Sequence, residues 1–314
     1  MVLCTGYSGR HFHPGKGIMT ADSKQYVVVV NPKGGTGQGV AVLHQVEPLL
    51  AAAGAEVTVC LTTASGHARQ IAATVPLEHC AGFCVIGGDG TLHEVVNGLM
   101  QRPGSRPPIG VIPGGTGNSV ARHFGVAGPL DAVQRILTGT TRPLDVLRVT
   151  MPTAVAHCVN IVGWGAVTDI NRAAERLRFL GPPRYALAAL WQLLRQPARP
   201  ARLTLDGETR PGRFVLIAGC NTQFTGKGMR LAPAAEPDDG WLDVIVVGHV
   251  SRWRMLQVLL RVFNGTHTAL PWVESHRVRA FAIAGVGGLN LDGELRGTAP
   301  VAVELQPGAL RILA

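Results

Sequence analysis

The fold is decided by the stretch Phe83-Cys84-Val85-Ile86-Gly87-Gly88-Asp89-Gly90-Thr91, in which a short apolar run ends in a glycine-rich turn. Apolar residues at helical spacing follow this turn. The same order of apolar run, glycine turn and helical segment recurs at residues 26–53 and from residue 109. Short apolar runs of this kind are typical of parallel strands that are buried on both faces. The sequence therefore predicts an open parallel sheet with crossover helices, including strands at 26–30 and 56–61.

The glycine turns indicate what this sheet could bind. In an open parallel sheet every strand-to-helix loop emerges at the carboxyl edge, so the turns are expected to lie together. Their backbone N–H groups stand beside helix N-termini, which favours phosphate through hydrogen bonds and the helix dipole. The first turn, Gly34–Gly39, is neither a P-loop, because Gly-Lys-Ser/Thr is missing, nor the dinucleotide fingerprint G-x-G-x-x-G. The predicted ligand is a polyphosphate.

Length and composition set limits on the class of protein. The chain has 314 residues, of which 46% are hydrophobic and 16% charged, a size that suits two domains. Apolar runs such as Ala186–Trp191 are far shorter than the ~18–20 residues that span a bilayer. The formal net charge of +9 favours anionic partners such as nucleotide phosphates, nucleic acid or an acidic membrane face. These features predict a soluble α/β enzyme.

The pattern changes near residue 146, where short strand-like runs with turn residues between them predict an antiparallel β domain. These runs are Arg202–Leu205, Arg213–Gly219, Trp241–Val247, Val278–Ile283, Val301–Leu305 and Leu310–Leu313. We therefore expect a disordered arm at 1–23, an α/β nucleotide-binding domain at 24–145 and a β-sandwich domain at 146–314. The last strands of the sandwich are free to pack back onto the first domain.

The cysteines and the N-terminal residues bear on location. The six cysteines form no C-x-x-C pair and lie in apolar surroundings, which favours buried thiols in a reducing compartment. Residues 1–23 lack the apolar segment of a secretory signal, and Val2 excludes N-myristoylation. We expect a cytoplasmic protein.

The motifs resemble those of the diacylglycerol kinase catalytic domain family of lipid kinases. The resemblance rests on Asn31-Pro32-Lys33-Gly34-Gly35, on Gly87–Thr91 with His93–Leu99 after it, and on Pro113-Gly114-Gly115-Thr116-Gly117-Asn118. The chain resembles the sphingosine and ceramide kinase branch more closely, from about residue 26 to its end. Matching residues of that branch are Trp164, Gly165, Asp169, Arg178, Gly181, Arg184 and the motif Asp292-Gly293-Glu294.

This resemblance implies an ATP- and Mg²⁺-dependent kinase of a lipid hydroxyl, with a sphingoid long-chain base as acceptor, an NAD-kinase-like α/β domain and a β-sandwich domain that holds the lipid. Asp89 would be the general base, which suits a reaction that depends on positioning and electrostatics. The residues implied for ATP are Asn31, Pro32, Lys33, Gly34, Gly35, Thr62, Gly88, Gly90, Thr91, Glu94, Gly115, Thr116, Gly117, Asn118, Arg178, Arg184, Asp292, Gly293 and Glu294. Those implied for the lipid are Gly87, Asp169 and Asn171, and the Mg²⁺ ligands stay unassigned.

Three departures from the family pattern concern the acceptor. Asn171 stands where the sphingosine kinase branch has a second Asp for the charged head group, which favours a neutral hydroxyl or amide. Ser119 stands where bacterial diacylglycerol kinases carry an Asp of a magnesium network, which favours the sphingoid branch. Gly87 replaces a frequent Ser of that branch. Diacylglycerol and ceramide therefore stay alternatives, as do an NAD-kinase-like enzyme and an inactive lipid- or nucleotide-binding module.

Three further sequence features bear on partners and on ordinary structural roles. Nine arginines within 172–213 suit phosphates or anionic lipid head groups better than nucleic acid, so we expect no nucleic-acid partner. We also expect no stable protein partner, and transient, peripheral contact with a membrane surface. A second Asp-Gly-Glu at 206–208 is typical of a hairpin turn. Trp253, Leu256, Leu260 and Phe263 form a helical stripe that predicts a buried face.

Overall fold

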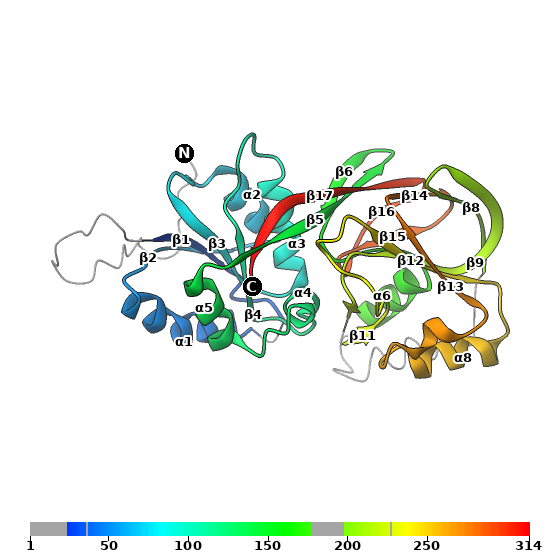
Figure 1. Ribbon diagram of the computed structural model, residues 1–314, viewed down its shortest axis with the longest axis horizontal. Coiled ribbons are helices and arrows are strands. Elements are labelled where there is room, and N and C mark those ends of the chain that lie inside the picture. The colour runs from blue at the N-terminus through cyan, green and yellow to red at the C-terminus, as the bar shows by residue number, and fades with distance from the viewer. Residues whose placement is uncertain (1–23, 36, 177–197, 227) are drawn as a thin grey trace. The chain divides into compact units, whose positions relative to one another are not determined.

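The computed structural model describes residues 24–35, 37–176, 198–226 and 228–314 (Figure 1). The chain forms two compact units. The first runs to Leu144 and includes Gly308–Ala314, and the second spans Asp145–Pro307. The expected arm at 1–23, and with it Arg178 and Arg184, lies outside the described residues.

The first unit is a parallel sheet with the strand order β2-β1-β3-β4, and the end of β17 pairs in parallel with β4. Its strands are β1 (Gln25–Val30), β2 (Glu56–Leu61), β3 (Cys80–Gly87) and β4 (Ile109–Pro113). Its helices are α1 (Gly39–Ala52), α2 (His67–Thr74), α3 (Asp89–Leu99), α4 (Ser119–His123) and α5 (Pro129–Thr138). β5 (Thr141–Met151) and β17 (Val301–Leu313) contribute residues to both units.

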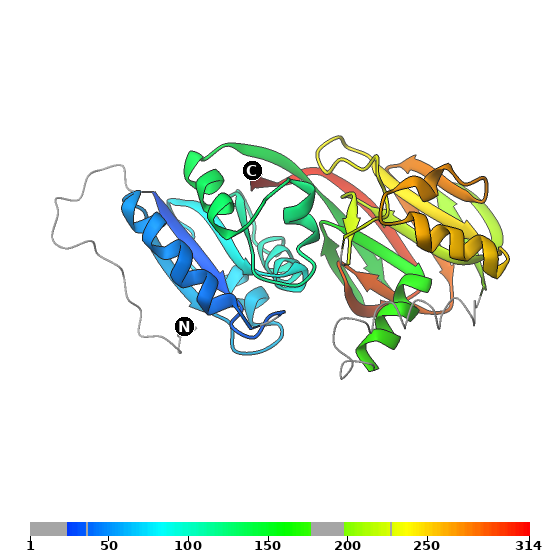
Figure 2. The ribbon, with the colours of Figure 1, turned by 90° about the horizontal axis from the view of Figure 1, so that it is seen from below.

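Apolar side chains on both faces of this sheet hold the helices. Val46 of α1 and Ile136 of α5 pack with Val28 and Ile112 in one cluster, with α1 alongside the strands in Figure 2. α2 packs against α3, and α3 against β3. The α/β arrangement predicted from the repeated glycine turns is confirmed.

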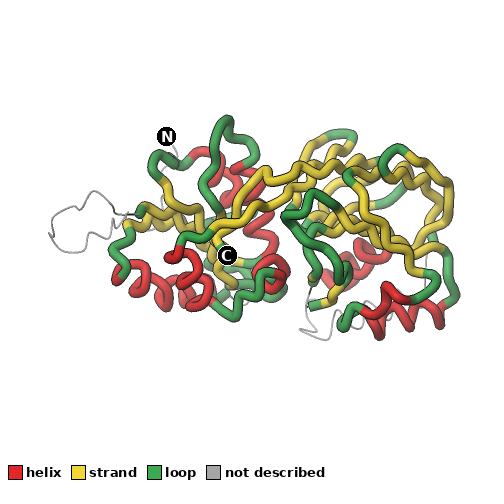
Figure 3. The backbone as a smooth tube through the Cα atoms, viewed as in Figure 1, coloured by secondary structure: helices red, strands yellow, loops and turns green. Residues whose placement is uncertain are grey.

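The second unit is mostly strand (Figure 3) and mostly antiparallel. Its path runs β16-β15-β7-β9-β8-β14-β17, while β12 pairs with β9 and β13, and β6 with β5. The remaining elements are β6 (Ala154–Cys158), β7 (Ile161–Gly165), α6 (Ala166–Arg176), β8 (Arg199–Leu205), β9 (Glu208–Cys220), β10 (Phe224–Thr225), β11 (Met229–Arg230), β12 (Leu242–Gly248), α8 (Arg252–Arg261), the 3-10 helix η2 (Thr266–Ala269), β13 (Val273–Val278), β14 (Ala280–Gly285), β15 (Gly288–Leu291) and β16 (Glu294–Thr298).

Period-two alternation divides the apolar residues of this unit between two cores. Val244 and Val246 of β12 face the sandwich interior, together with Trp164 and Phe281. Val247, on the opposite face of β12, packs into a second cluster to which α8 and the segment before it contribute. The apolar side chains of β12 therefore follow the alternation that a two-sided strand requires.

In two places the predicted division of the chain into strands is wrong. The run Val278–Ile283 was expected as one strand, but it is divided between β13 and β14, with Arg279 between them. The runs 301–305 and 310–313 were expected as two strands, but β17 is continuous. Its first half pairs with β14, its end pairs with β4, and β5 is a further partner, so Pro307 and Gly308 lie inside one continuous strand.

The predicted burial of the helical stripe on α8 is also wrong. Trp253 is 76% exposed, Leu260 70% and Phe263 57%. Val258 and Val262 face the core instead. The helix has two apolar faces, and the sequence pattern could not decide which of them meets the sheet.

Among the described residues, the cysteines at 60, 80, 84, 158 and 220 are free thiols, and all except Cys80 are buried. No helix in the described part of the chain is long and apolar enough to cross a membrane.

Candidate active site

The three glycine turns of the first unit meet backbone to backbone. They follow β1, β3 and β4 at the carboxyl edge of the parallel sheet. A Cβ atom on Gly115 would lie 2.4 Å from the Cα atom of Gly88, and a Cβ atom on Gly35 would lie 2.9 Å from the Cα atom of Gly115. Only glycine allows this approach, so these residue types bring three sets of backbone N–H groups to one place.

Asp89 stands where two of these turns lead into helices. It is the first residue of α3. Its Oδ1 accepts a hydrogen bond from the backbone N–H of Ser119 at 2.7 Å, and its Oδ2 accepts one from the Ser119 hydroxyl at 3.1 Å. Ser119 is the first residue of α4. The carboxylate is thus fixed at two helix starts, where negative charge is favoured, and its oxygens retain lone pairs that could accept a hydroxyl proton.

Two asparagines keep the turns in shape. The amide of Asn31 donates to Thr91 Oγ1 at 3.0 Å, and Asn31 Oδ1 accepts the N–H of Lys33 at 3.1 Å, so the first turn is tied to the second. Asn118 Oδ1 accepts the N–H of Gly115 at 3.0 Å, while its amide donates to the Gly115 carbonyl at 2.8 Å. The third turn is therefore closed on itself before α4 begins.

Glu94 has a structural partner that the sequence did not reveal. Its carboxylate accepts the backbone N–H groups of Gly66 at 2.7 Å and Ala68 at 3.2 Å, which lie at the start of α2. It therefore caps α2 from α3. Thr62, another residue predicted for ATP, is buried at the end of β2, and its N–H donates to the Val30 carbonyl at 2.9 Å.

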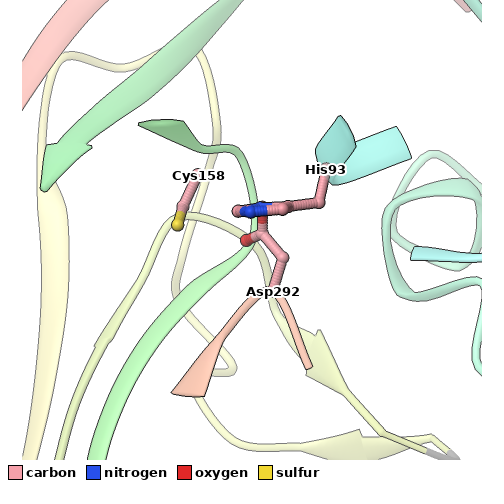
Figure 4. Close-up of side chains that lie close together, drawn as sticks. All are labelled: His93, Cys158 and Asp292. Carbon is pink, nitrogen blue, oxygen red and sulfur yellow. The ribbon is translucent and has the colours of Figure 1, made fainter. Parts of the chain in front are cut away.

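Asp292 is a buried predicted residue of the second unit. It occupies the hairpin between β15 and β16 with a φ of 52° and is 2% exposed. Its carboxylate accepts the backbone N–H groups of Val159 at 3.2 Å, Asn160 at 2.9 Å and Ile161 at 3.0 Å. Figure 4 draws this carboxylate with Cys158, whose thiol pKa is raised well above its usual value by burial and by the negative charge of Asp292.

Asp169 carries an ion pair. Nη2 of Arg199 lies 2.9 Å from its Oδ1 and 2.8 Å from its Oδ2, and Asp169 is 7% exposed. Asn171 lies on the same helix, α6. Glu294 is exposed at the start of β16, and the N–H of Gly293 donates to Asn290 Oδ1 at 2.9 Å.

The second Asp-Gly-Glu is a hairpin turn, as predicted. It connects β8 to β9, and Asp206 accepts the N–H groups of Arg279 and Ala280, both at 2.9 Å. Asp206 and Asp292 share the left-handed backbone of a type I′ turn, with φ values of 43° and 52°. They differ in burial, which the tripeptide cannot encode.

The predicted residues thus divide between the units. The structure brings together Asn31, Gly35, Gly88, Asp89, Thr91, Gly115 and Asn118 in the first unit. It places Asp169, Asn171, Asp292, Gly293 and Glu294 in the second. Ser119, which holds Asp89, was not among the predicted site residues, and its position at the start of the helix after the third turn was the available signal. A Mg²⁺ site built from one carboxylate and substrate phosphates would suit Asp89 and the amide-lined turns around it.

Comparisons with known proteins identify the family. The family model of the diacylglycerol kinase catalytic domain matches residues 25–149. The model of the YegS C-terminal NAD kinase beta sandwich-like domain matches residues 160–314. A diacylglycerol kinase of Mycobacterium tuberculosis (strain ATCC 25618 / H37Rv) is 30% identical over 292 residues, covering 91% of this chain and 93% of that protein. The chain belongs to the diacylglycerol kinase catalytic domain family of lipid kinases.

The resemblance drawn from the glycine turns is therefore confirmed, and so is the fold class. The family includes relatives with different acceptors in their names. Sphingosine kinase 1 of Arabidopsis thaliana is 26% identical and covers 83% of this chain and 64% of its own length. The crystal structure of a diacylglycerol kinase from Bacillus anthracis str. Sterne has a TM-score of 0.70 and 24% identity, covering 94% of this chain and 97% of that chain, a likeness that shows the shared fold.

Proposed function

We propose that this lipid kinase transfers the γ-phosphate of ATP to a lipid hydroxyl, with Asp89 as the general base. The family implies the kinase activity and the use of ATP. The observation that supports the assignment of the base is the meeting of three glycine turns beside Asp89, whose two carboxylate oxygens are both held by Ser119.

In this proposal the amide groups of the turns bind the phosphates of ATP, and Arg178 and Arg184 are further phosphate contacts. Asp89 takes the proton of the acceptor hydroxyl while the new bond forms between the hydroxyl oxygen and the γ-phosphorus. The bond between the γ-phosphorus and the bridging oxygen breaks, and ADP leaves with the electron pair. Mg²⁺, when bound, would neutralise phosphate charge. Ser119 keeps the carboxylate oriented toward the hydroxyl.

The first acceptor that we propose is a sphingoid long-chain base. The residue pattern from Trp164 to Arg184 and the presence of Ser119 support it, because both are similar to the sphingosine kinase branch. The two Arabidopsis thaliana sphingosine kinases among the relatives, at 26% and 28% identity, are consistent with this choice.

The second candidate is diacylglycerol, and a specific contact favours it. Arg199 pairs with Asp169, so the carboxylate implied for the lipid already has a positive partner and would gain less from an ammonium group. Diacylglycerol carries no such group. Bacterial relatives named diacylglycerol kinase also match over most of both chains, for example that of Bacillus subtilis at 29% identity.

The experiment is phosphate transfer from labelled ATP, with Mg²⁺, to sphinganine, sphingosine, ceramide, diacylglycerol and NAD in mixed micelles. Asp89→Asn is run beside it, with Asp131→Asn as the matched control, because Asp131 also lies in the first turn of a helix, α5. Label in one lipid that is lost only in Asp89→Asn supports the proposal and names the acceptor. Label in NAD alone, or in nothing, overturns it.

A lipid acceptor resides in a bilayer, so the proposal includes transient contact with a membrane surface from the cytoplasmic side. Peripheral association of this kind needs an apolar surface, a positive surface or both.

A further inference from the structure

The helix α8 presents a row of large apolar side chains to solvent. Trp253, Leu260 and Phe263 are 76%, 70% and 57% exposed. Trp253 and Leu260 are two turns apart on α8 and so share a face, and Phe263 follows shortly after the end of the helix. Single exposed apolar residues are common in folded proteins, but three large ones on one short segment indicate an interaction surface.

This row is not the face that attaches α8 to its own unit. Met255, Val258 and Val262 pack into the cluster under the helix, together with Val247 of β12. The Ser251 side chain accepts the N–H of Arg254 at 3.4 Å and begins the helix. With one apolar face already buried, the opposite face of a surface helix is normally polar. Stability of the fold therefore gives no reason for Trp253, Leu260 and Phe263.

The charged side chains on this segment of the chain are all of one sign. Arg252, Arg254 and Arg261 are exposed on the same helix. Between Asp243 and Glu274 the sequence contains no acidic residue. The guanidinium carbon of Arg254 lies 5.0 Å from the centre of the Trp272 ring, which supports this side chain at the surface. Basic and aromatic residues combined on one short helix are typical of segments that lie in the interface of an anionic bilayer.

We propose that α8, with Phe263, docks the second unit on an anionic lipid bilayer. Trp253, Leu260 and Phe263 enter the boundary between head groups and acyl chains, and the three arginines contact lipid phosphates. Figures 1 and 2 show α8 along the periphery of its unit. The inference rests on the membrane contact in the proposed function and names its surface. Vesicle binding is measured without ATP, so a protein that does not bind vesicles can be distinguished from one that does not transfer phosphate.

The test is flotation of the full chain with vesicles of phosphatidylcholine alone or mixed with phosphatidylglycerol. We expect binding to the mixed vesicles that weakens in high salt. The double variant Trp253→Gln, Leu260→Gln should bind about tenfold more weakly or worse. Arg252→Gln or Arg261→Gln should each weaken binding about fivefold. Val155→Gln is the matched control, because Val155 is 45% exposed on β6, outside α8, and it should bind as the unchanged protein does.

If the double variant still transfers phosphate to an acceptor in detergent micelles, it is folded. If the double variant is not folded, Phe263→Gln provides a second test of vesicle binding. The proposal is overturned if the unchanged protein ignores anionic vesicles, or if folded variants bind them equally well. It is also overturned if light scattering shows a dimer that the double variant abolishes while vesicle binding persists, because the row would then be covered by a second copy of the chain.

Discussion

Ser119 holds both carboxylate oxygens of Asp89, one through its backbone N–H at 2.7 Å and the other through its hydroxyl at 3.1 Å. The two residues belong to different glycine turns, those that follow β3 and β4. The contact therefore does more than satisfy a carboxylate. It joins the starts of α3 and α4 and fixes the direction in which a base at position 89 could act.

Replacing the base should separate binding from turnover. We expect Asp89→Asn to bind ATP as the unchanged enzyme does but to lower kcat by about 10²–10⁴, because general-base catalysis contributes factors of this size. Steady-state kinetics with the identified lipid and titration with ATP measure the two effects. An unchanged kcat would refute the assigned role.

Removing the hydroxyl that holds the base should have a smaller effect. Ser119→Ala deletes the bond to Asp89 Oδ2 but leaves the backbone bond to Oδ1. Loss of one hydrogen bond to a charged group predicts a fall in kcat of about tenfold, with KM for ATP nearly unchanged. Ser119→Thr restores a hydroxyl and should recover part of the rate. If both variants match the unchanged enzyme, the contact does not position the base.

The close approach of the turns predicts a strong effect at Gly115. A methyl group there would meet the Cα atom of Gly88 at 2.4 Å, so Gly115→Ala must push the second and third turns apart. We expect a loss of about 1–3 kcal/mol in the free energy of unfolding, as for overpacked sites, and weaker ATP binding. Gly248→Ala is the control, because the atom nearest to the added methyl group would be the Arg213 carbonyl oxygen, at 3.8 Å. Similar denaturation midpoints and ATP affinities for the two variants would contradict this account.

The buried carboxyl of Asp243 predicts a pH dependence of stability. Burial raises its pKa from 3.8 to about 6, the negative charges of Asp239 and Glu236 add to this, and Arg277 opposes it. Because the folded pKa lies above the unfolded one, the folded state binds this proton more tightly. The proton on Asp243 therefore stabilises the folded state at low pH, and this stabilisation is lost as the pH rises from about 4 through about 6.

Asp243→Asn should remove this dependence. Relative to the unchanged protein, the variant should have a higher Tm at about pH 8 than it does at about pH 4. Thermal denaturation at both pH values, with Asp206→Asn as an exposed control, measures it. A pH-independent difference would show that Asp243 does not titrate in this range.

Patterns of apolar residues were sufficient for much of the fold. The strand at 56–61 was predicted to the residue, and β1 begins one residue earlier than expected. Strand and turn signals are local, and the meeting of the glycine turns follows from sheet topology. Burial was harder to predict on α8, because its two apolar faces have equivalent patterns, and only packing shows that Val258 faces inward while Trp253 does not.

Long-range polar contacts could not be predicted at all. Glu94 caps a helix that begins 27 residues earlier in the chain, and Arg199 pairs with Asp169 across 30 residues. No spacing rule connects such partners, because the fold brings them together only after the strands have paired. Roles inferred from motifs alone therefore had to leave these partners unnamed.

The two Asp-Gly-Glu hairpins provide a matched test of how burial decides the importance of a motif. Asp292 is 2% exposed and accepts three backbone N–H groups, whereas the bonds of Asp206 to Arg279 and Ala280 are exposed to solvent. Asn tolerates the left-handed backbone of both turns. Asp292→Asn, however, turns an amide donor toward buried N–H donors, which should lower the free energy of unfolding by about 2–3 kcal/mol. Asp206→Asn should leave the free energy of unfolding nearly unchanged. Denaturant unfolding compares them, and equal effects at both positions would mean that the buried contacts of Asp292 do not stabilise the fold.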